Sequence, residues 1–133
     1  MSNLQTVQSI YEAFGRGDIR AILGHLHTDI DWDYGITDAG VPWLRPGRGP
    51  SHVRQFFESL SAVDFKTFQP KTFLEAGNVV VALIDVAFEV KATGRPVKEE
   101  DEVHIWHFDG EGHVTRVSHK IDTYQHWVAF RGE

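Results

Sequence analysis

The fold is decided by residues 66–123, which read KTFQPKTFLEAGNVVVALIDVAFEVKATGRPVKEEDEVHIWHFDGEGHVTRVSHKIDT. Four runs in this stretch are rich in Val, Ile, Phe and Thr, as β-strands are. They cover residues 66–75, 79–91, 97–108 and 113–123, and short turn sequences with Gly, Asn and Asp separate them. Consecutive strands joined by tight turns pair in antiparallel fashion. The stretch therefore predicts a four-stranded antiparallel meander.

The sequence before this stretch has helical periodicity. Apolar residues recur at helical spacing over residues 4–14, 19–26 and 53–60, and a brief strand is predicted at 30–34. Helices that precede a run of strands are typical of the α+β class, in which the helices cover one face of the sheet. Because long strands twist and curl, we expect a curved antiparallel sheet that three N-terminal helices close around an internal pocket.

Residues 35–50 are rich in Gly and Pro and carry Trp43 in their middle, so no regular structure is expected there. A long loop inside a compact domain is usually functional or disordered. Since Trp43 offers a large apolar surface, we expect this loop to pack down as a lid or rim of the pocket.

Composition bounds the class of protein. The 133 residues, 41% hydrophobic and 24% charged, predict one globular domain over 1–133. A formal net charge of −6 repels a phosphate backbone, so nucleic acid is not an expected partner. The absence of cysteine excludes disulfides and Cys-based zinc sites and favours a cytoplasmic location. No apolar run approaches the roughly 20 residues of a membrane span, so no membrane partner is expected.

Four segments, in this order and spacing, resemble the NTF2-like superfamily, especially its SnoaL-like and ketosteroid-isomerase-like members. They are the helix break at 17–22, the strand at 29–33, the entry to the third helix at 47–57 and the closing hairpin at 108–114. The resemblance covers nearly the whole chain and implies the cone-shaped NTF2-like (cystatin-like) fold and a homodimer across the open sheet face. It names no reaction, because this fold hosts isomerases, cyclases, dehydratases, epoxide hydrolases and binding modules.

Three positions depart from the ketosteroid isomerases that the chain resembles. The position of their oxyanion-hole tyrosine falls at Ile10, one residue short of Tyr11. The position of their base falls near Tyr34, beside Asp33, and the position of their protonated acid falls at His104. These departures argue against steroid isomerisation.

Asp122 matches a catalytic position in other members of the superfamily that the chain resembles. It stands where SnoaL-type polyketide cyclases and limonene-epoxide-hydrolase-like enzymes carry a catalytic aspartate, which implies a role as general base. The alternative is that Asp122 caps a C-terminal segment, 123–130. Scytalone-dehydratase-like members use two histidines and an aspartate, and we expect His104 and His119 on neighbouring strands, so dehydration stays open.

His104 and His119 interrupt apolar strand runs, and an inward imidazole must find a hydrogen-bond partner. Each is either a pocket residue or a satisfied structural histidine. Since side chains alternate along a strand, His119 and Asp122 face opposite sides unless a bulge intervenes. Asp33 is a candidate to orient an imidazole or to take a proton, and otherwise is simply solvated.

Aromatic side chains are expected to line the pocket with flat apolar surface, although residues at such spacing are often plain core. The expected lining consists of Tyr11, Phe14, Trp32, Tyr34, Trp43, Phe57 and Trp106. The acidic run 99–102 is interpreted as a solvated face that protects a sheet edge, with Asp101 as an alternative second pocket acid. No metal or nucleotide cofactor is expected, because the histidine spacings and the glycine-rich residues 47–50 do not match such sites.

These observations predict a cofactor-independent enzyme that performs acid-base chemistry on a small, largely apolar organic ligand, as a polyketide cyclase or isomerase does when it moves a proton beside a carbonyl. Asp122 is the expected base, and His104 and His119 donate hydrogen bonds or shuttle the proton, with Asp33 orienting one of them. A dehydratase or epoxide-hydrolase-like enzyme is the first alternative, and two imidazoles converging on one site favour dehydration. A non-catalytic binding or dimerisation module is the other, favoured by an open or polar-starved cavity with Asp122 on the surface.

Overall fold

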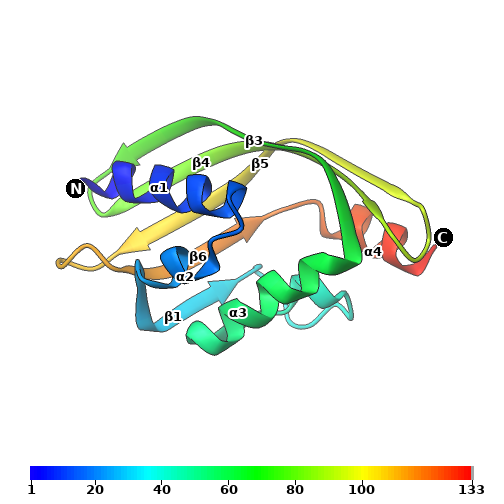
Figure 1. The fold of residues 1–133 in the computed structure, drawn as a ribbon, viewed down its shortest axis with the longest axis horizontal. Helices are drawn as coiled ribbons and strands as arrows, with labels where there is room; N and C mark the ends of the chain where they lie inside the picture. Colours follow the sequence, from blue (N-terminus) through cyan, green and yellow to red (C-terminus); the bar gives the residue numbers. More distant parts are fainter. Residues whose placement is uncertain (133) are drawn as a thin grey trace.

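The computed structural model describes residues 1–132 and has a curved six-stranded sheet at its centre, in the order β2-β1-β6-β5-β4-β3. Figure 1 shows the helices α1, α2 and α3 on one side of this sheet, and α4 near the far ends of the long strands. The strands are β1 (Leu26–Asp33), β2 (Gly47–Arg48), β3 (Val63–Ala76), β4 (Val79–Val90), β5 (Pro96–Phe108) and β6 (Val114–Lys120). The helices are α1 (Asn3–Gly15), α2 (Ile19–Leu23), α3 (Pro50–Ser59) and α4 (Thr123–Arg131), with short 3-10 turns η1 (Pro42–Leu44) and η2 (Leu60–Ala62).

Local chemistry explains where the N-terminal helices begin. Ser2 and Gln5 form a reciprocal capping box at the start of α1, and the Asp18 carboxylate accepts the Ala21 backbone N–H at the start of α2. Pro50 occupies the first turn of α3, where its missing N–H costs nothing. These signals are all readable in the sequence, and the three predicted helices are present.

The antiparallel meander β3-β4-β5-β6 is confirmed. Buried and partly exposed residues alternate along all of β4, so the sheet presents one apolar face to the helices. The sheet is mixed rather than wholly antiparallel, because β1 pairs in parallel with β6. The α+β class and the curved sheet closed by helices stand as expected.

Several element boundaries differ from the sequence expectation. Leu26 begins β1 instead of ending the second helix, because its side chain is buried in the sheet layer. The Gly- and Pro-rich segment contains η1 and the two-residue β2, and Trp43 is only 3% exposed. The last strand ends at Lys120, because Asp122 starts α4 there.

The core lies between the concave face of the sheet and the helices. It is built by aliphatic residues that are almost fully buried, among them Val7, Ile10, Ile22, Ile30 and Ile84. No helix within residues 1–132 is long and apolar enough to cross a membrane.

Candidate active site

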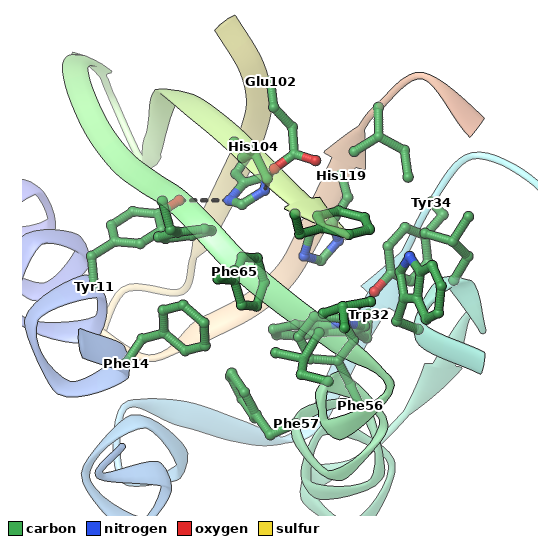
Figure 2. Close-up of a pocket in the computed structure, with 18 of the residues that line it drawn as sticks. Tyr11, Phe14, Trp32, Tyr34, Phe56, Phe57, Phe65, Glu102, His104 and His119 are labelled. Carbon is green, nitrogen blue, oxygen red and sulfur yellow. Dashed lines mark hydrogen bonds and ion pairs between the residues drawn. The ribbon is translucent and has the colours of Figure 1, made fainter. Parts of the chain in front are cut away.

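A cavity of about 90 Å³ lies between the sheet and the helices. Figure 2 shows aromatic side chains from α1 and α3 on its helical side and the strands β5 and β6 behind it. Its wall is mostly apolar, and the polar side chains that reach it are few: two tyrosines, three histidines, one glutamate and the indole nitrogens. All seven aromatic residues expected from the sequence line it, namely Tyr11, Phe14, Trp32, Tyr34, Trp43, Phe57 and Trp106. Such a cavity suits a small, flat, largely apolar ligand.

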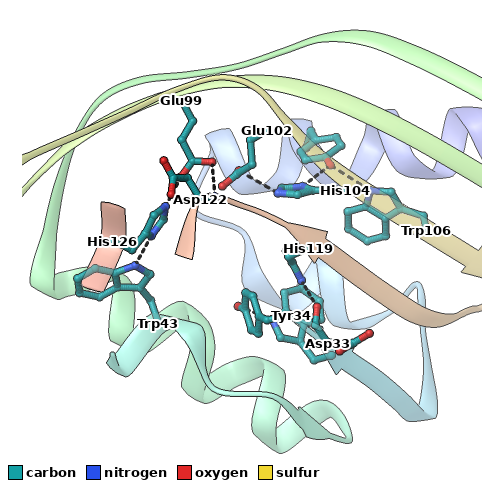
Figure 3. Close-up of polar contacts among 12 residues, drawn as sticks. Asp33, Tyr34, Trp43, Glu99, Glu102, His104, Trp106, His119, Asp122 and His126 are labelled. Atoms are coloured by element: carbon teal, nitrogen blue, oxygen red, sulfur yellow. Dashed lines mark hydrogen bonds and ion pairs between the residues drawn. The ribbon is translucent and has the colours of Figure 1, made fainter. Parts of the chain in front are cut away.

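One wall carries a chain of hydrogen bonds that runs from α1 into β5 (Figure 3). The Trp106 indole N–H donates to the Tyr11 hydroxyl oxygen over 3.0 Å. That hydroxyl lies 2.7 Å from Nδ1 of His104, and Nε2 of the same ring lies 3.0 Å from a carboxyl oxygen of Glu102. Tyr11, His104 and Glu102 therefore form a continuous path along which a proton can move.

Burial changes the acid-base behaviour of this chain. Loss of water lowers the pKa of His104 to about 4, so the ring is neutral at pH 7. Burial, with the nearby charge of Glu99, raises the pKa of Glu102 to about 8. Burial also raises the pKa of Tyr11, although the hydrogen bond from Trp106 opposes that shift. At neutral pH Glu102 is therefore expected to carry a proton.

A β-bulge explains why Glu102 reaches the cavity. Ile84 pairs with Glu102 and Val86 pairs with Glu99, so a single residue of β4 faces two residues of β5. Asp101 has a φ of 61° at this bulge, and the extra residue turns both Glu99 and Glu102 inward. The interpretation of the acidic run as a solvated face is wrong for these two glutamates, which are 9% and 8% exposed.

The outer face of the sheet braces the same bulge. Lys71 Nζ lies 2.8 Å from carboxylate oxygens of both Asp85 and Asp101, and the Asp101 N–H donates to Asp85. The two carboxylates raise the pKa of Lys71. Asp101 thus points outward to Lys71 and is not a second pocket acid.

The opposite wall of the cavity is built by β1 and β6. His119 Nδ1 donates to the backbone carbonyl of Asp33 over 3.0 Å, and the imidazole stacks on the Tyr34 ring at 4.6 Å between centroids. Nε2 of His119 has no hydrogen-bond partner among residues 1–132, and the ring lines the cavity. Burial, and then the neighbouring His104, lower the pKa of His119 to about 3. This nitrogen is therefore a free acceptor rather than a donor.

Tyr34 adds a donor beside that acceptor. The Trp32 indole N–H donates to the Tyr34 hydroxyl oxygen over 3.0 Å, which leaves the hydroxyl hydrogen available to a ligand. The rings of His104 and His119 lie 4.9 Å apart, so the two predicted histidines converge on one cavity.

Asp33 lies next to this wall but turns its carboxylate away from it. The carboxylate binds Arg116 at 2.6 Å and accepts from Ser118, and the Arg116 bond, helped by the Gly35 N–H, lowers the pKa of Asp33 to about 2. Asp33 therefore orients His119 through its backbone carbonyl, not through its acid group.

Asp122 does not line the cavity. Its exposed side chain accepts the Gln125 backbone N–H at the start of α4, which is the capping alternative weighed from the sequence. Asp122 lies beyond the end of β6 at Lys120, so no bulge within the strand brings it to the face of His119. The structure offers no support for Asp122 as the base.

A second buried group lies behind Glu102. His126 on α4 contacts the Glu99 carboxylate through Nε2, and its Nδ1 accepts the Trp43 indole N–H over 3.0 Å. Possible ligand atoms of Glu99, Glu102 and His126 lie within 4.8 Å of one another, close enough to share a metal ion. A neutral histidine that binds a metal through Nε2 carries its hydrogen on Nδ1. Trp43 donates to Nδ1 here, so the donor set does not fit a metal.

Sequence reasoning missed Glu99, Glu102 and His126 in this site. Glu102 stands two residues before His104, which places it on the same face, and this spacing was the available signal. Nothing local signalled that Glu99 also faces inward, because that depends on the bulge opposite Asp85.

Comparison with known proteins identifies similar sequences and folds. The sequence pattern of the SnoaL-like domain matches residues 7–117. No curated protein matches the chain. An NTF2-like protein of unknown function from Burkholderia pseudomallei K96243 superposes with a TM-score of 0.84 at 26% identity, covering 98% of both chains.

Two further structures are similar. An NTF2-like protein from Burkholderia xenovorans LB400 has a TM-score of 0.83 at 26% identity, covering 96% of this chain and 95% of that one. TerC, co-crystallised with polyporic acid, has a TM-score of 0.81 at 21% identity, covering 97% and 98%. The last likeness shows the fold alone.

Proposed function

Because the chain belongs to the family of SnoaL-like domains, we propose that it is an acid-base enzyme that moves a proton on a small, largely apolar carbonyl compound. The observation that carries the proposal is the Tyr11–His104–Glu102 chain, which opens into an otherwise aromatic cavity. Similar folds include proteins provisionally named as a polyketide cyclase and an isomerase, and TerC was crystallised with polyporic acid.

The role of each polar side chain follows from the hydrogens and lone pairs that it can offer to the ligand. Tyr11 exchanges the proton with the ligand and His104 relays it, because each of these groups already shares a hydrogen with the next group along the hydrogen-bonded path. Tyr34 donates to the ligand's carbonyl oxygen, where charge develops when a neighbouring proton leaves. His119 accepts a hydrogen bond from a ligand hydroxyl, since a ring with a pKa of about 3 is a weak base at pH 7.

Dehydration is the second candidate, and a specific observation favours it. The imidazoles of His104 and His119 converge on one cavity, which is the arrangement expected of a two-histidine dehydratase. In elimination the same chain would return the proton to a departing hydroxyl group instead of to carbon. A binding module is less favoured, because the cavity carries convergent polar groups even though Asp122 is on the surface.

Two probes that lead to one product separate these reactions. 3-Cyclohexenone gives 2-cyclohexenone by isomerisation, and 3-hydroxycyclohexanone gives the same product by loss of water. We expect the chain to accelerate at least one reaction, Tyr11→Phe to abolish the acceleration, and His107→Gln, on the outer face of β5, to keep it.

Failure of both probes to react, together with no solvent-deuterium exchange beside the carbonyl of bound cyclohexanone, would favour the binding module. A homodimer across the open sheet face and a cytoplasmic location stay predictions, and light scattering in solution tests the first.

A further inference from the structure

We propose that Glu99 and Glu102 share one proton at neutral pH. This buried carboxyl pair finally accepts and holds the proton that leaves a ligand in the cavity, and His104 and Tyr11 connect the pair to the cavity. The proposal rests on the proposed proton transfer and adds Glu99, which does not line the cavity, to the machinery. It also supplies the carboxylate base that Asp122 does not.

The closeness of the two buried carboxyl groups favours a proton on one of them. Both side chains are more than nine-tenths buried, and a carboxyl oxygen of Glu99 lies within 4.8 Å of one of Glu102. Two like charges at this separation in a buried site cannot both be ionised without a large cost. One of the two groups is therefore protonated.

The neighbours identify which group is ionised. Trp43 donates to Nδ1 of His126, so the hydrogen of that neutral ring is on Nε2 and points to Glu99. The Asp122 backbone N–H also donates to Glu99, over 3.4 Å. Two donors stabilise the Glu99 carboxylate, so the shared proton belongs chiefly to Glu102.

The hydrogen bonds at the Trp106 end of the path point in the same direction. A tryptophan N–H only donates, so the Tyr11 oxygen accepts from Trp106, and in the tautomer assigned by the proposal its own hydrogen goes to His104 Nδ1. His104 then carries its hydrogen on Nε2 and donates it to one carboxyl oxygen of Glu102, and the shared proton belongs between Glu102 and the nearby Glu99. In this tautomer every donor from Trp106 to His104 points toward the two carboxyl groups. Figure 3 shows Trp106, His104, Glu102 and Glu99 in this order.

This arrangement permits a balanced proton transfer. The Tyr11 oxygen takes a proton from the ligand while its own hydrogen passes to His104 Nδ1. The hydrogen on Nε2 passes to Glu102, and the shared proton moves to Glu99. The ligand becomes the anion, the carboxyl pair becomes neutral, and the reverse sequence returns the proton.

Other titratable groups around Glu102 come from four elements and from Tyr34, which follows β1, and each can affect the titration of Glu102. They are Glu99 and His104 on β5, His126 on α4, Tyr11 on α1, and Tyr34 and His119 on the opposite wall. Of these, only Glu99 brings a negative charge against Glu102 at pH 7. Removing that charge is therefore the sharpest test.

Carbon-13 NMR of the glutamate carboxyl groups against pH tests the proposal without any substrate. We expect one glutamate to titrate near pH 8 in the wild type, and the same signal to be missing in Glu102→Gln. In Glu99→Gln it should move to lower pH, because the neighbouring charge is gone. Glu100→Gln, exposed on the same strand, is the control and should change nothing.

The ring nitrogens of His104 should follow the same transition in nitrogen-15 spectra. Ionisation of every glutamate carboxyl at pH 7 in the wild type, or a Glu102 titration that ignores Glu99→Gln, would overturn the proposal. The NMR titration does not depend on catalysis. If the carboxyl pair titrates as expected but the protein is inactive on every probe, the proposed function is wrong and the shared proton stands.

Discussion

The two walls of the cavity use a histidine in opposite ways. On the β5 wall both ring nitrogens of His104 are occupied, by Tyr11 and Glu102. On the β1–β6 wall His119 uses one nitrogen on the backbone of Asp33 and leaves the other free. Both rings are almost fully buried and both have a lowered pKa, so burial alone does not distinguish them.

This difference shows that the hydrogen-bond partners of a buried histidine decide its role in the cavity. A histidine with a proton donor on one side and a carboxyl group on the other can pass a proton through itself. A histidine with a single free lone pair can hold and orient a ligand, since its tautomer is determined by the backbone carbonyl. Substitutions on each wall should therefore have different effects.

The largest effect is expected from replacing the two histidines and measuring kcat and KM on the cyclohexenone probe. His104→Gln interrupts the chain and should lower kcat by about 10²–10⁴-fold. His119→Asn retains a donor for the Asp33 carbonyl but removes the free nitrogen, so it should mainly raise KM. Equal losses of kcat in both variants would contradict the different roles assigned to the two histidines.

A smaller effect is expected on stability when each tyrosine loses its hydroxyl group. Tyr11→Phe leaves both the Trp106 N–H and a nitrogen of His104 without partners, whereas Tyr34→Phe leaves only the Trp32 N–H. Each unpaired buried group costs about 1–3 kcal/mol. Urea unfolding should therefore show roughly twice the loss for Tyr11→Phe, and a larger loss for Tyr34→Phe would contradict the connectivity.

The smallest effect is a pH dependence of the free energy of unfolding. The pKa values of His104 and His119 are lowered to about 4 and 3, so the unfolded chain binds more protons below pH ~6.5 and stability rises with pH there. Glu102, raised to about 8, binds its proton more tightly when folded, so its contribution falls from pH ~4.3 to 8. Stability should peak near pH ~6.5.

Glu102→Gln sharpens that profile, because Gln does not titrate. The decline above the maximum should become shallower in this variant, while the rise below it remains. Unfolding midpoints in urea between pH 5 and 9 are the measurement, and an unchanged decline would place the responsible group elsewhere.

Much of the site was predictable because it follows from architecture. The apolar positions of the helices and the alternation along the strands place Tyr11, Trp32 and Trp106 on inward faces, where they line the cavity. His104 and His119 were identified because they interrupt apolar strands. The capping role of Asp122 was also open from the sequence, since Asp is a preferred N-cap.

Sequence by itself determined the helices, the meander and the aromatic character of the pocket, because these depend on local propensity and on a period of 3.6 or 2 residues. Only the tertiary structure decided which acids are buried. A bulge in β5, braced from the outer face by Lys71, shifts the alternation between Glu99 and Glu102, and such a shift depends on the partner strand rather than on the residues themselves.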